Sequence, residues 1–156
     1  ELRRELARRH AGARVLVVED EPTNREVADS LLRSVGLTPS VAENGAQAVD
    51  RVAAGEPFDL ILMDIQMPVM DGFQATAAIR AMPDPIKAHL PIIAMTAHAM
   101  KEDAERCIAA GMDAYISKPI QAEQLAIDQI NAAETTPFFR KSLLIVPSLI
   151  RLIVVF

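Results

Sequence analysis

The feature that most constrains the fold of this chain is the alternation of short apolar runs with longer segments of helical periodicity. Three runs, at 15–18, 60–63 and 92–95, are continuously apolar, as parallel strands buried on both faces are. We expect five strands, at 14–19, 38–42, 59–64, 91–96 and 113–117. We expect a helix after each strand, at 22–35, 46–54, 73–82, 99–110 and 121–132. Successive strand-helix units predict a parallel sheet covered by helices on both faces.

The handedness of strand-helix-strand connections narrows the arrangement of this sheet. Right-handed crossovers leave few topologies, and the simplest is the strand order 2-1-3-4-5. The second strand contains Pro39, which has no backbone N–H to donate, so this strand suits an edge of the sheet. The predicted fold class is therefore α/β, a flavodoxin-like (βα)5 doubly wound parallel sheet.

The chain of 156 residues is expected to form one domain with short additions at both ends. Leu2 and Leu6 share one face of an amphipathic segment, so residues 1–12 are interpreted as a linker helix. Residues 13–132 contain the predicted sheet and its helices. Residues 133–156 form an atypical apolar C-terminal tail. Its apolar run, 142–156, has three open interpretations: a non-native or disordered end, an arm that packs on this or a neighbouring copy, and, as the least favoured, a membrane-surface anchor.

Charge and cysteine content bear on the class of function and on location. The net charge is −5 although residues 1–14 hold five arginines against two glutamates, so the body of the chain is strongly acidic. An acidic body argues against nucleic-acid binding. The single cysteine, Cys107, cannot form an internal disulfide, and no apolar run reaches the roughly 18 residues expected of a membrane span. We therefore expect a cytoplasmic location.

Acidic residues follow two of the apolar strands at the same end. Glu19 and Asp20 come directly after the first run, and Asp64 ends the third strand. The carboxyl ends of parallel strands meet at one edge of the sheet, where open α/β sheets hold their ligands. Carboxylates a few ångströms apart repel by roughly 4 kcal/mol per pair at a surface-like dielectric, so a positive charge is needed among them. Oxygen ligands without His or Cys favour Mg²⁺ over zinc.

Two further strand ends add groups suited to phosphoryl chemistry. The fourth strand ends in Thr96, and Lys118 directly follows the fifth strand. A carboxylate beside Mg²⁺ and a lysine can attack a phosphoryl group and form an aspartyl phosphate. Asp64 is the expected nucleophile because its strand is central. Lys118 would offset the charge of the phosphoryl oxygens, and the Thr96 hydroxyl would donate a hydrogen bond to one of them.

Each of these residues also has a simpler explanation when it is taken alone. Asp20 could form a turn or cap a helix, Thr96 could cap the fourth helix, and a lysine is usually solvated. Tyr115, the only tyrosine, could be a half-buried strand residue, or a ring that changes rotamer when Thr96 moves. The occurrence of such groups at the same end of successive strands is what favours a functional site.

The same residues carry a resemblance to a known family. The matching segments are the acidic pair 19–20, the segment 64–72 (Asp-Ile-Gln-Met-Pro-Val-Met-Asp-Gly), the pair 96–97 and the segment 115–119 (Tyr-Ile-Ser-Lys-Pro). Over about residues 13–132 the chain resembles the receiver domain of two-component response regulators, which has the flavodoxin-like fold expected here. The resemblance implies a role in His-Asp phosphorelay signalling.

The resemblance implies the roles of the acidic residues. Asp64 would accept a phosphoryl group from a phosphohistidine on a partner, which would be a histidine kinase or a histidine phosphotransfer domain. Glu19 and Asp20 would hold Mg²⁺ together with Asp64. The backbone carbonyl of Gln66 would be a further ligand of the metal.

The resemblance also implies how the signal leaves the site. Lys118 would contact the phosphoryl group. Thr96 and Tyr115 would relay the change to the face made by the fourth helix, the fifth strand and the fifth helix, because a packed two-state element converts a small local shift into a new surface. That face, or the C-terminal tail, is a possible contact for a homodimer.

Two segments, 19–24 (Glu-Asp-Glu-Pro-Thr-Asn) and 96–100 (Thr-Ala-His-Ala-Met), look like those of receivers fused to hybrid sensor histidine kinases. The chain has no ATP-binding glycine-rich segment and no histidine-bearing dimerisation helix, so we expect a signalling domain and not an enzyme. The expected cytoplasmic location then includes the cytoplasmic part of a membrane-bound sensor kinase.

An alternative from another class is a Mg²⁺-dependent phosphohydrolase that forms an aspartyl phosphate on a similar sheet. Such enzymes usually carry a second Asp two residues after the nucleophile, as general acid and base. Gln66 occupies this position, so no proton donor is available for a leaving group and the alternative is disfavoured. A pseudo-receiver that only binds partners is disfavoured too, because the acidic pair, the threonine and the lysine are all present.

Overall fold

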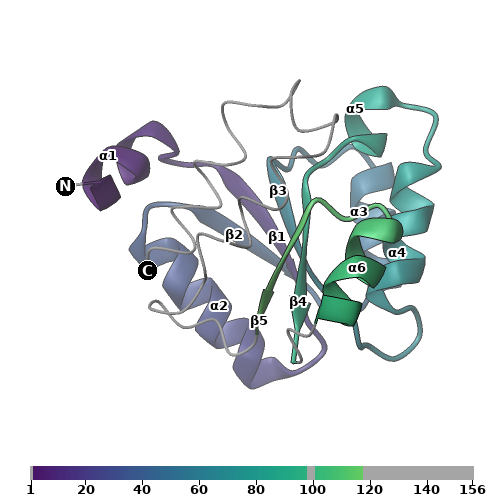
Figure 1. Cartoon of the computed structure of the whole chain (residues 1–156). Helices are drawn as coiled ribbons and strands as arrows, with labels where there is room; N and C mark the ends of the chain where they lie inside the picture. Colours follow the sequence, from purple (N-terminus) through teal and green to yellow (C-terminus); the bar gives the residue numbers. More distant parts are fainter. Residues whose placement is uncertain (1, 98–100, 118–156) are drawn as a thin grey trace.

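The structure of the chain is a computed structural model, which describes residues 2–97 and 101–117 (Figure 1). In this part of the chain, parallel strands form one sheet in the order β2-β1-β3-β4-β5. The strands are β1 (Arg14–Val18), β2 (Thr38–Ala42), β3 (Leu60–Asp64), β4 (Ile92–Thr96) and β5 (Ala114–Ser117). The predicted fold class and strand order are confirmed, with the proline-containing strand at an edge.

Helices lie on both sides of this sheet, with α2 against one face and α3, α4 and α6 on the other (Figure 1). The helices are α1 (Leu2–Arg9), α2 (Pro22–Ser34), α3 (Gly45–Ala53), α4 (Gly72–Arg80), α5 (Pro85–Ala88) and α6 (Lys101–Ala109). The helix expected at 121–132 and the C-terminal tail lie outside the described residues. Within those residues, none of the helices has the length and apolar character that a membrane crossing requires.

The short helix α5 was not predicted from the sequence, because Pro83 and Pro85 directly follow the helix expected at 73–82 and prolines there are typical of a helix end followed by a loop. Pro85 instead lies in the first turn of α5, where its missing N–H leaves no helical bond unmade. The Asp84 side chain accepts a hydrogen bond from the backbone N–H of Ile86 at 2.9 Å and caps this turn. A proline that follows an aspartate therefore begins a helix here.

The register of the central strands brings their carboxyl ends to one edge of the molecule. Val18 of β1 lies beside Met63 of β3, and Asp64 of β3 lies beside Met95 of β4. Every residue of β3 and β4 is buried, which accounts for their continuously apolar sequences. This buried core makes the sheet a rigid base for the side chains that follow β1, β3 and β4.

Arg80 ties several elements together through groups near the amino ends of β4 and β5. Its guanidinium donates to Asp113 Oδ2 at 3.0 Å, and the same oxygen accepts the backbone N–H of Ile92 at 2.8 Å. The guanidinium also donates to the carbonyl oxygens of Leu90 (2.7 Å), Ala88 (2.8 Å) and Gly111 (3.0 Å). Burial has the largest effect on the pKa of both groups: it raises the pKa of Asp113 and lowers the pKa of Arg80. The attraction between the two charges shifts each pKa in the opposite direction.

We predict that Arg80→Met lowers the free energy of unfolding by about 3–5 kcal/mol, because it leaves the Asp113 carboxylate buried without its partner. Arg33→Met is the matched control, since Arg33 pairs with Asp29 on the exposed side of α2 and should cost no more than about 1 kcal/mol. Urea unfolding of both variants measures the difference. Equal losses would contradict the role given to Arg80.

Candidate functional site

Three carboxylates converge at the carboxyl edge of the sheet. Glu19 and Asp20 follow β1, Asp64 ends β3, and one oxygen from each side chain lies within 4.8 Å of the others. Glu19 and Asp64 are 2% and 3% exposed, whereas Asp20 is exposed. The structure thus brings together the three acidic residues that the sequence placed at the ends of two strands, and it leaves Asp20 open to solvent.

Backbone N–H groups hold the two buried carboxylates in place. The N–H of Glu21 donates to Glu19 Oε1 at 3.1 Å, and the N–H of Gln66 donates to Asp64 Oδ1 at 3.1 Å. Each donor lies two residues after its acceptor, so the turn that follows the strand orients the carboxylate at the strand's end. A hydrogen bond to an ionised acceptor is stronger than one between neutral groups. The chain itself therefore helps to offset the cluster's negative charge.

Thr96 ends β4 and is buried beside a cavity of about 380 Å³. This cavity has polar and apolar walls from the loop after β3, the start of α4, the end of β4 and α6. Its lining residues are Ile65, Gln66, Met67, Asp71, Phe73, Thr96, Ala97, Asp103 and Arg106. Arg106 lies over the Phe73 ring at 5.1 Å from its centroid, which joins α6 to α4 across the cavity. Thr96 and Gln66 therefore share one cavity beside the acidic cluster.

The remaining residues of the predicted site differ in what can be said of them. Tyr115 lies on β5 beside Ala94 of β4, is half-buried and packs against the hydrophobic core. This packing agrees with the simpler of its two interpretations, and the relay role stays a prediction. Lys118 lies outside the described residues, so its position relative to Asp64 stays a prediction as well.

The loop after β3 folds back onto the strand that carries Asp64. The N–H of Gly72 donates to the carbonyl of Ile65 at 3.2 Å, and a Cβ atom at Gly72 would overlap the Asp64 carbonyl oxygen and lie 2.8 Å from Ile65 Cα. Asp71 then caps α4 in a capping box with Gln74. Glycine is therefore needed at position 72 for the first turn of α4 to lie against the backbone of Asp64.

The tip of the same loop adopts an unusual backbone conformation. Val69 has φ of 69° and is almost fully exposed, and the N–H of Met70 donates to the carbonyl of Pro68 at 2.8 Å across it. A β-branched residue in this region stores strain on the order of 1–3 kcal/mol. The Met70 carbonyl accepts the N–H of Gly45 at 3.2 Å, which fixes the loop to the start of α3. Strain of this kind is held in place by the packing around it.

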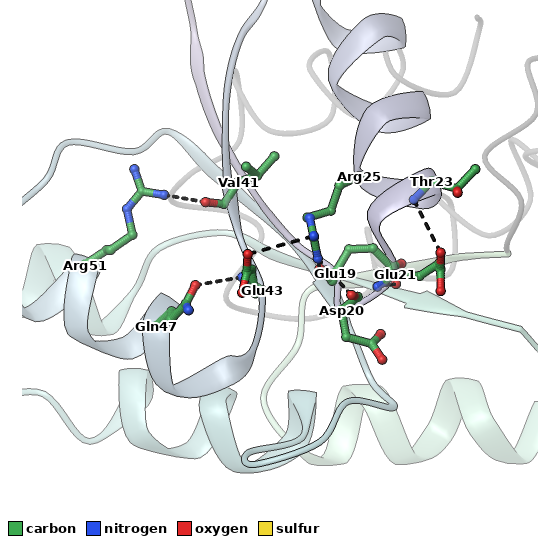
Figure 2. A network of polar contacts seen from close by, with 9 residues as sticks. All are labelled: Glu19, Asp20, Glu21, Thr23, Arg25, Val41, Glu43, Gln47 and Arg51. Carbon is green, nitrogen blue, oxygen red and sulfur yellow. Dashed lines mark hydrogen bonds and ion pairs between the residues drawn. The ribbon is translucent and has the colours of Figure 1, made fainter.

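Two residues at this edge were missed by sequence reasoning. The need for glycine at position 72 was not predicted, because a spatial conflict with the Asp64 carbonyl has no local signal in the sequence. Arg25 was not singled out from the sequence, yet its guanidinium donates to the backbone carbonyls of Glu19 and Asp20 (Figure 2). An arginine five residues after a strand-end acid is a signal that could have found it.

The topology and the acidic edge together define a class, that of flavodoxin-like domains that hold an oxygen-ligand site at the carboxyl ends of their strands. Residues 15–128 match the family model of the response regulator receiver domain. The chain belongs to this family, as the resemblance of its motifs implied.

Three comparisons illustrate the relationship. Sensor protein GacS of Pseudomonas syringae pv. syringae is 47% identical over 114 residues, which cover 72% of this chain and 12% of that protein. The second is the receiver domain of sensor histidine kinase PA1611 of Pseudomonas aeruginosa PAO1, which was solved with a magnesium ion coordinated in its active site cleft. It has a TM-score of 0.64 at 42% identity, and the match covers 71% of this chain and 88% of that one. The third is the Saccharomyces cerevisiae complex of the histidine phosphotransfer protein Ypd1 with the receiver domain of Ssk1. It has a TM-score of 0.62 at 29% identity, and the match covers 71% of this chain and 81% of that one.

We predict that Gly72→Ala moves the backbone around Asp64 and lowers the free energy of unfolding by about 1–3 kcal/mol, because the added methyl group overpacks this contact. The measurement is the set of amide signals of residues 64–66 by NMR, together with urea unfolding. Gly55→Ala is the control, since its φ of 89° imposes backbone strain but nothing lies within 4 Å of the added atom. Its signals at 64–66 should be unchanged. Unshifted signals in Gly72→Ala would show that the close approach does not position Asp64.

Proposed function

We propose that this chain is a phosphoaccepting receiver domain in His-Asp phosphorelay signalling and that Asp64 is the phosphoacceptor. The observation that carries the proposal is the convergence of Glu19, Asp20 and Asp64 at the carboxyl edge, in a chain that belongs to the receiver family. Asp64 is the acceptor because it ends the central strand of this edge and is held by the N–H of Gln66. The partner is a phosphohistidine on a histidine kinase or a histidine phosphotransfer domain.

The donor set of the acidic edge fits a hard divalent cation. It offers three carboxylates, one of them exposed, and no nitrogen or sulfur ligand among the residues of the cluster. Mg²⁺ is typically held by one or two carboxylates while it keeps several waters. Glu19, Asp20 and Asp64 would hold it, with the backbone carbonyl of Gln66 as a further ligand. When bound, Mg²⁺ neutralises charge on the transferring phosphoryl oxygens.

The residues of this chain orient the acceptor and the phosphoryl group. A carboxylate oxygen of Asp64 attacks the phosphorus and the P–N bond of the phosphohistidine breaks, with its electron pair going to the ring nitrogen. The partner's imidazole leaves in its neutral form, because its other ring nitrogen already carries a proton. The N–H of Gln66 keeps the carboxylate oriented for this attack. The hydroxyl of Thr96, at the cavity beside the cluster, donates to one phosphoryl oxygen. Lys118 contacts the same group in this proposal.

The phosphohydrolase alternative is not favoured. The general acid and base of such an enzyme would have to stand at position 66, where the exposed Gln66 has an amide that does not ionise near neutral pH. The family match instead supports a domain whose aspartyl phosphate is a signal. We propose that the chain acts as a signalling module, and that a histidine kinase core forms another part of the same parent protein.

The proposal extends to the organisation of the chain. Helix α1 supports a linker over residues 1–12, with the receiver over 13–132 and the apolar tail after it. The similarity to sensor kinases supports a hybrid kinase as the parent protein, with this domain in the cytoplasm. On phosphorylation, Thr96 and Tyr115 carry the change toward α6, β5 and the segment after β5. A homodimer through that face or the tail stays a prediction.

We predict that phosphoramidate with Mg²⁺ adds one phosphoryl group to the wild-type chain and none to Asp64→Asn, because the amide is not a nucleophile that can form the acyl phosphate. Intact-mass spectrometry measures the labelling. Asp29→Asn, which makes the same change of charge on α2, should label like the wild type, and a chelator should abolish labelling in both. Equal labelling of Asp64→Asn and the wild type would refute the assignment.

A further inference from the structure

We infer that Arg25 is a positioning residue for the acidic edge: its guanidinium holds the chain that follows β1 so that Glu19 and Asp20 can bind the cation. The inference rests on the proposed function, because it concerns how the same site is formed. Arg25 does not belong to the acidic cluster itself. Its role is to fix the segment that carries two of the three carboxylates.

The contacts of Arg25 are concentrated on three consecutive residues. Its Nη1 donates to the carbonyl oxygen of Glu19 at 2.9 Å and to that of Asp20 at 2.8 Å (Figure 2). Its backbone N–H donates to the carbonyl oxygen of Glu21 at 3.0 Å, at the start of α2. One residue thus bonds every carbonyl of the acidic segment 19–21. The side chain is only 16% exposed, so these bonds are largely protected from water.

These bonds fix the backbone from which the carboxylates of Glu19 and Asp20 extend. The carbonyl of a residue lies in the plane of the peptide that follows it, so holding the carbonyls of Glu19 and Asp20 fixes the direction of the Cα–Cβ bond of Asp20, which lies between the two planes. On the other side of the segment, the N–H of Glu19 donates to the carbonyl of Ala42 at 3.1 Å, which ties it to the end of β2. Held from both sides, the segment keeps Glu19 and Asp20 near Asp64 despite the repulsion between their charges.

The bonds to carbonyl oxygens are the main contribution of Arg25, and its ion pair is a minor one. The closest approach of Arg25 to Glu43 is 3.9 Å, and the Glu43 side chain is 65% exposed. An exposed pair of this kind contributes little, because water and salt screen it. Glu43 is in turn held by Gln47, whose side chain accepts its N–H at 2.9 Å (Figure 2). The proposal therefore predicts that Glu43→Gln has little effect on the acidic edge.

Positioning and charge predict opposite results when Arg25 is replaced. If the guanidinium acted only as a nearby positive charge, its removal would strengthen the binding of a cation to the acidic residues. If it positions the segment, its removal weakens binding although the protein becomes more negative. The loss of a group that holds a metal ligand in place without touching the metal typically lowers metal affinity by about 10–100-fold.

The experiment is a calorimetric titration of the full chain with Mg²⁺, comparing wild type with Arg25→Met, Arg25→Lys and Arg33→Met. We expect the dissociation constant of Arg25→Met to rise about tenfold or more. Arg25→Lys keeps the charge and a single donor group, so it should lie between this variant and the wild type. Arg33→Met removes the same charge from the same helix but breaks only a bond to Asp29, so its affinity should equal that of the wild type.

A second readout requires no metal and no activity. In the metal-free protein, the amide signals of residues 19–21 should shift in Arg25→Met and not in Arg33→Met. An unchanged or tighter dissociation constant in Arg25→Met, with or without a lower melting temperature, would overturn the inference. If circular dichroism shows that Arg25→Met is unfolded, the test uses the Mg²⁺ dissociation constant of Arg25→Lys instead. A dissociation constant equal to that of the wild type in Arg25→Lys would then overturn the inference. Failure of the proposed function is distinct, because it appears in the wild type as absent Mg²⁺ binding or in Asp64→Asn as undiminished labelling.

Discussion

The mutual repulsion of the Glu19, Asp20 and Asp64 carboxylates is the constraint on which the rest of this structure depends. Their oxygens lie within 4.8 Å of one another, and two of the side chains are buried. At an effective dielectric near 20, each such pair costs roughly 4 kcal/mol. The buried sheet, the N–H groups of the following turns and the anchoring of both loops all hold these charges together. Because repulsion between the carboxylates destabilises the edge when no cation is bound, binding a cation there is strongly favourable.

The molecule separates its stabilising contacts from its reactive ones. Near the amino ends of β4 and β5, Arg80 and Asp113 form a largely buried pair with backbone groups around it. At the carboxyl ends lie the acidic cluster, the strained Val69 and the contact between Gly72 and the backbone of Asp64. The fully buried strands β3 and β4 connect the two ends. Stability supplied at one end allows strain and repulsion to persist at the other.

The sequence predicted those features that depend on local pattern. Apolar runs identified the central strands, Pro39 placed β2 at an edge, and residues at strand ends predicted which acids meet. The sequence did not predict features that depend on distant contacts. Arg25 and Gly72 act on backbone carbonyls, which are invisible in the pattern of side chains. The helix α5 was missed because Pro85 follows α4 closely, and a proline is as typical of the residues after a helix as of the first turn of the next one. Lys118 and the C-terminal tail lie outside the residues that the structure describes, so the expectations about them stay predictions.

The central claim is that the carboxyl edge of the sheet holds a divalent cation between Glu19, Asp20 and Asp64. Anomalous diffraction from crystals grown with Mn²⁺, which accepts the same oxygen ligands as Mg²⁺, tests it most directly. The account predicts one strong anomalous peak at bonding distance from these carboxylates. Ordered Mn²⁺ bound only elsewhere, or an absence of any peak at this edge under saturating metal, would contradict it.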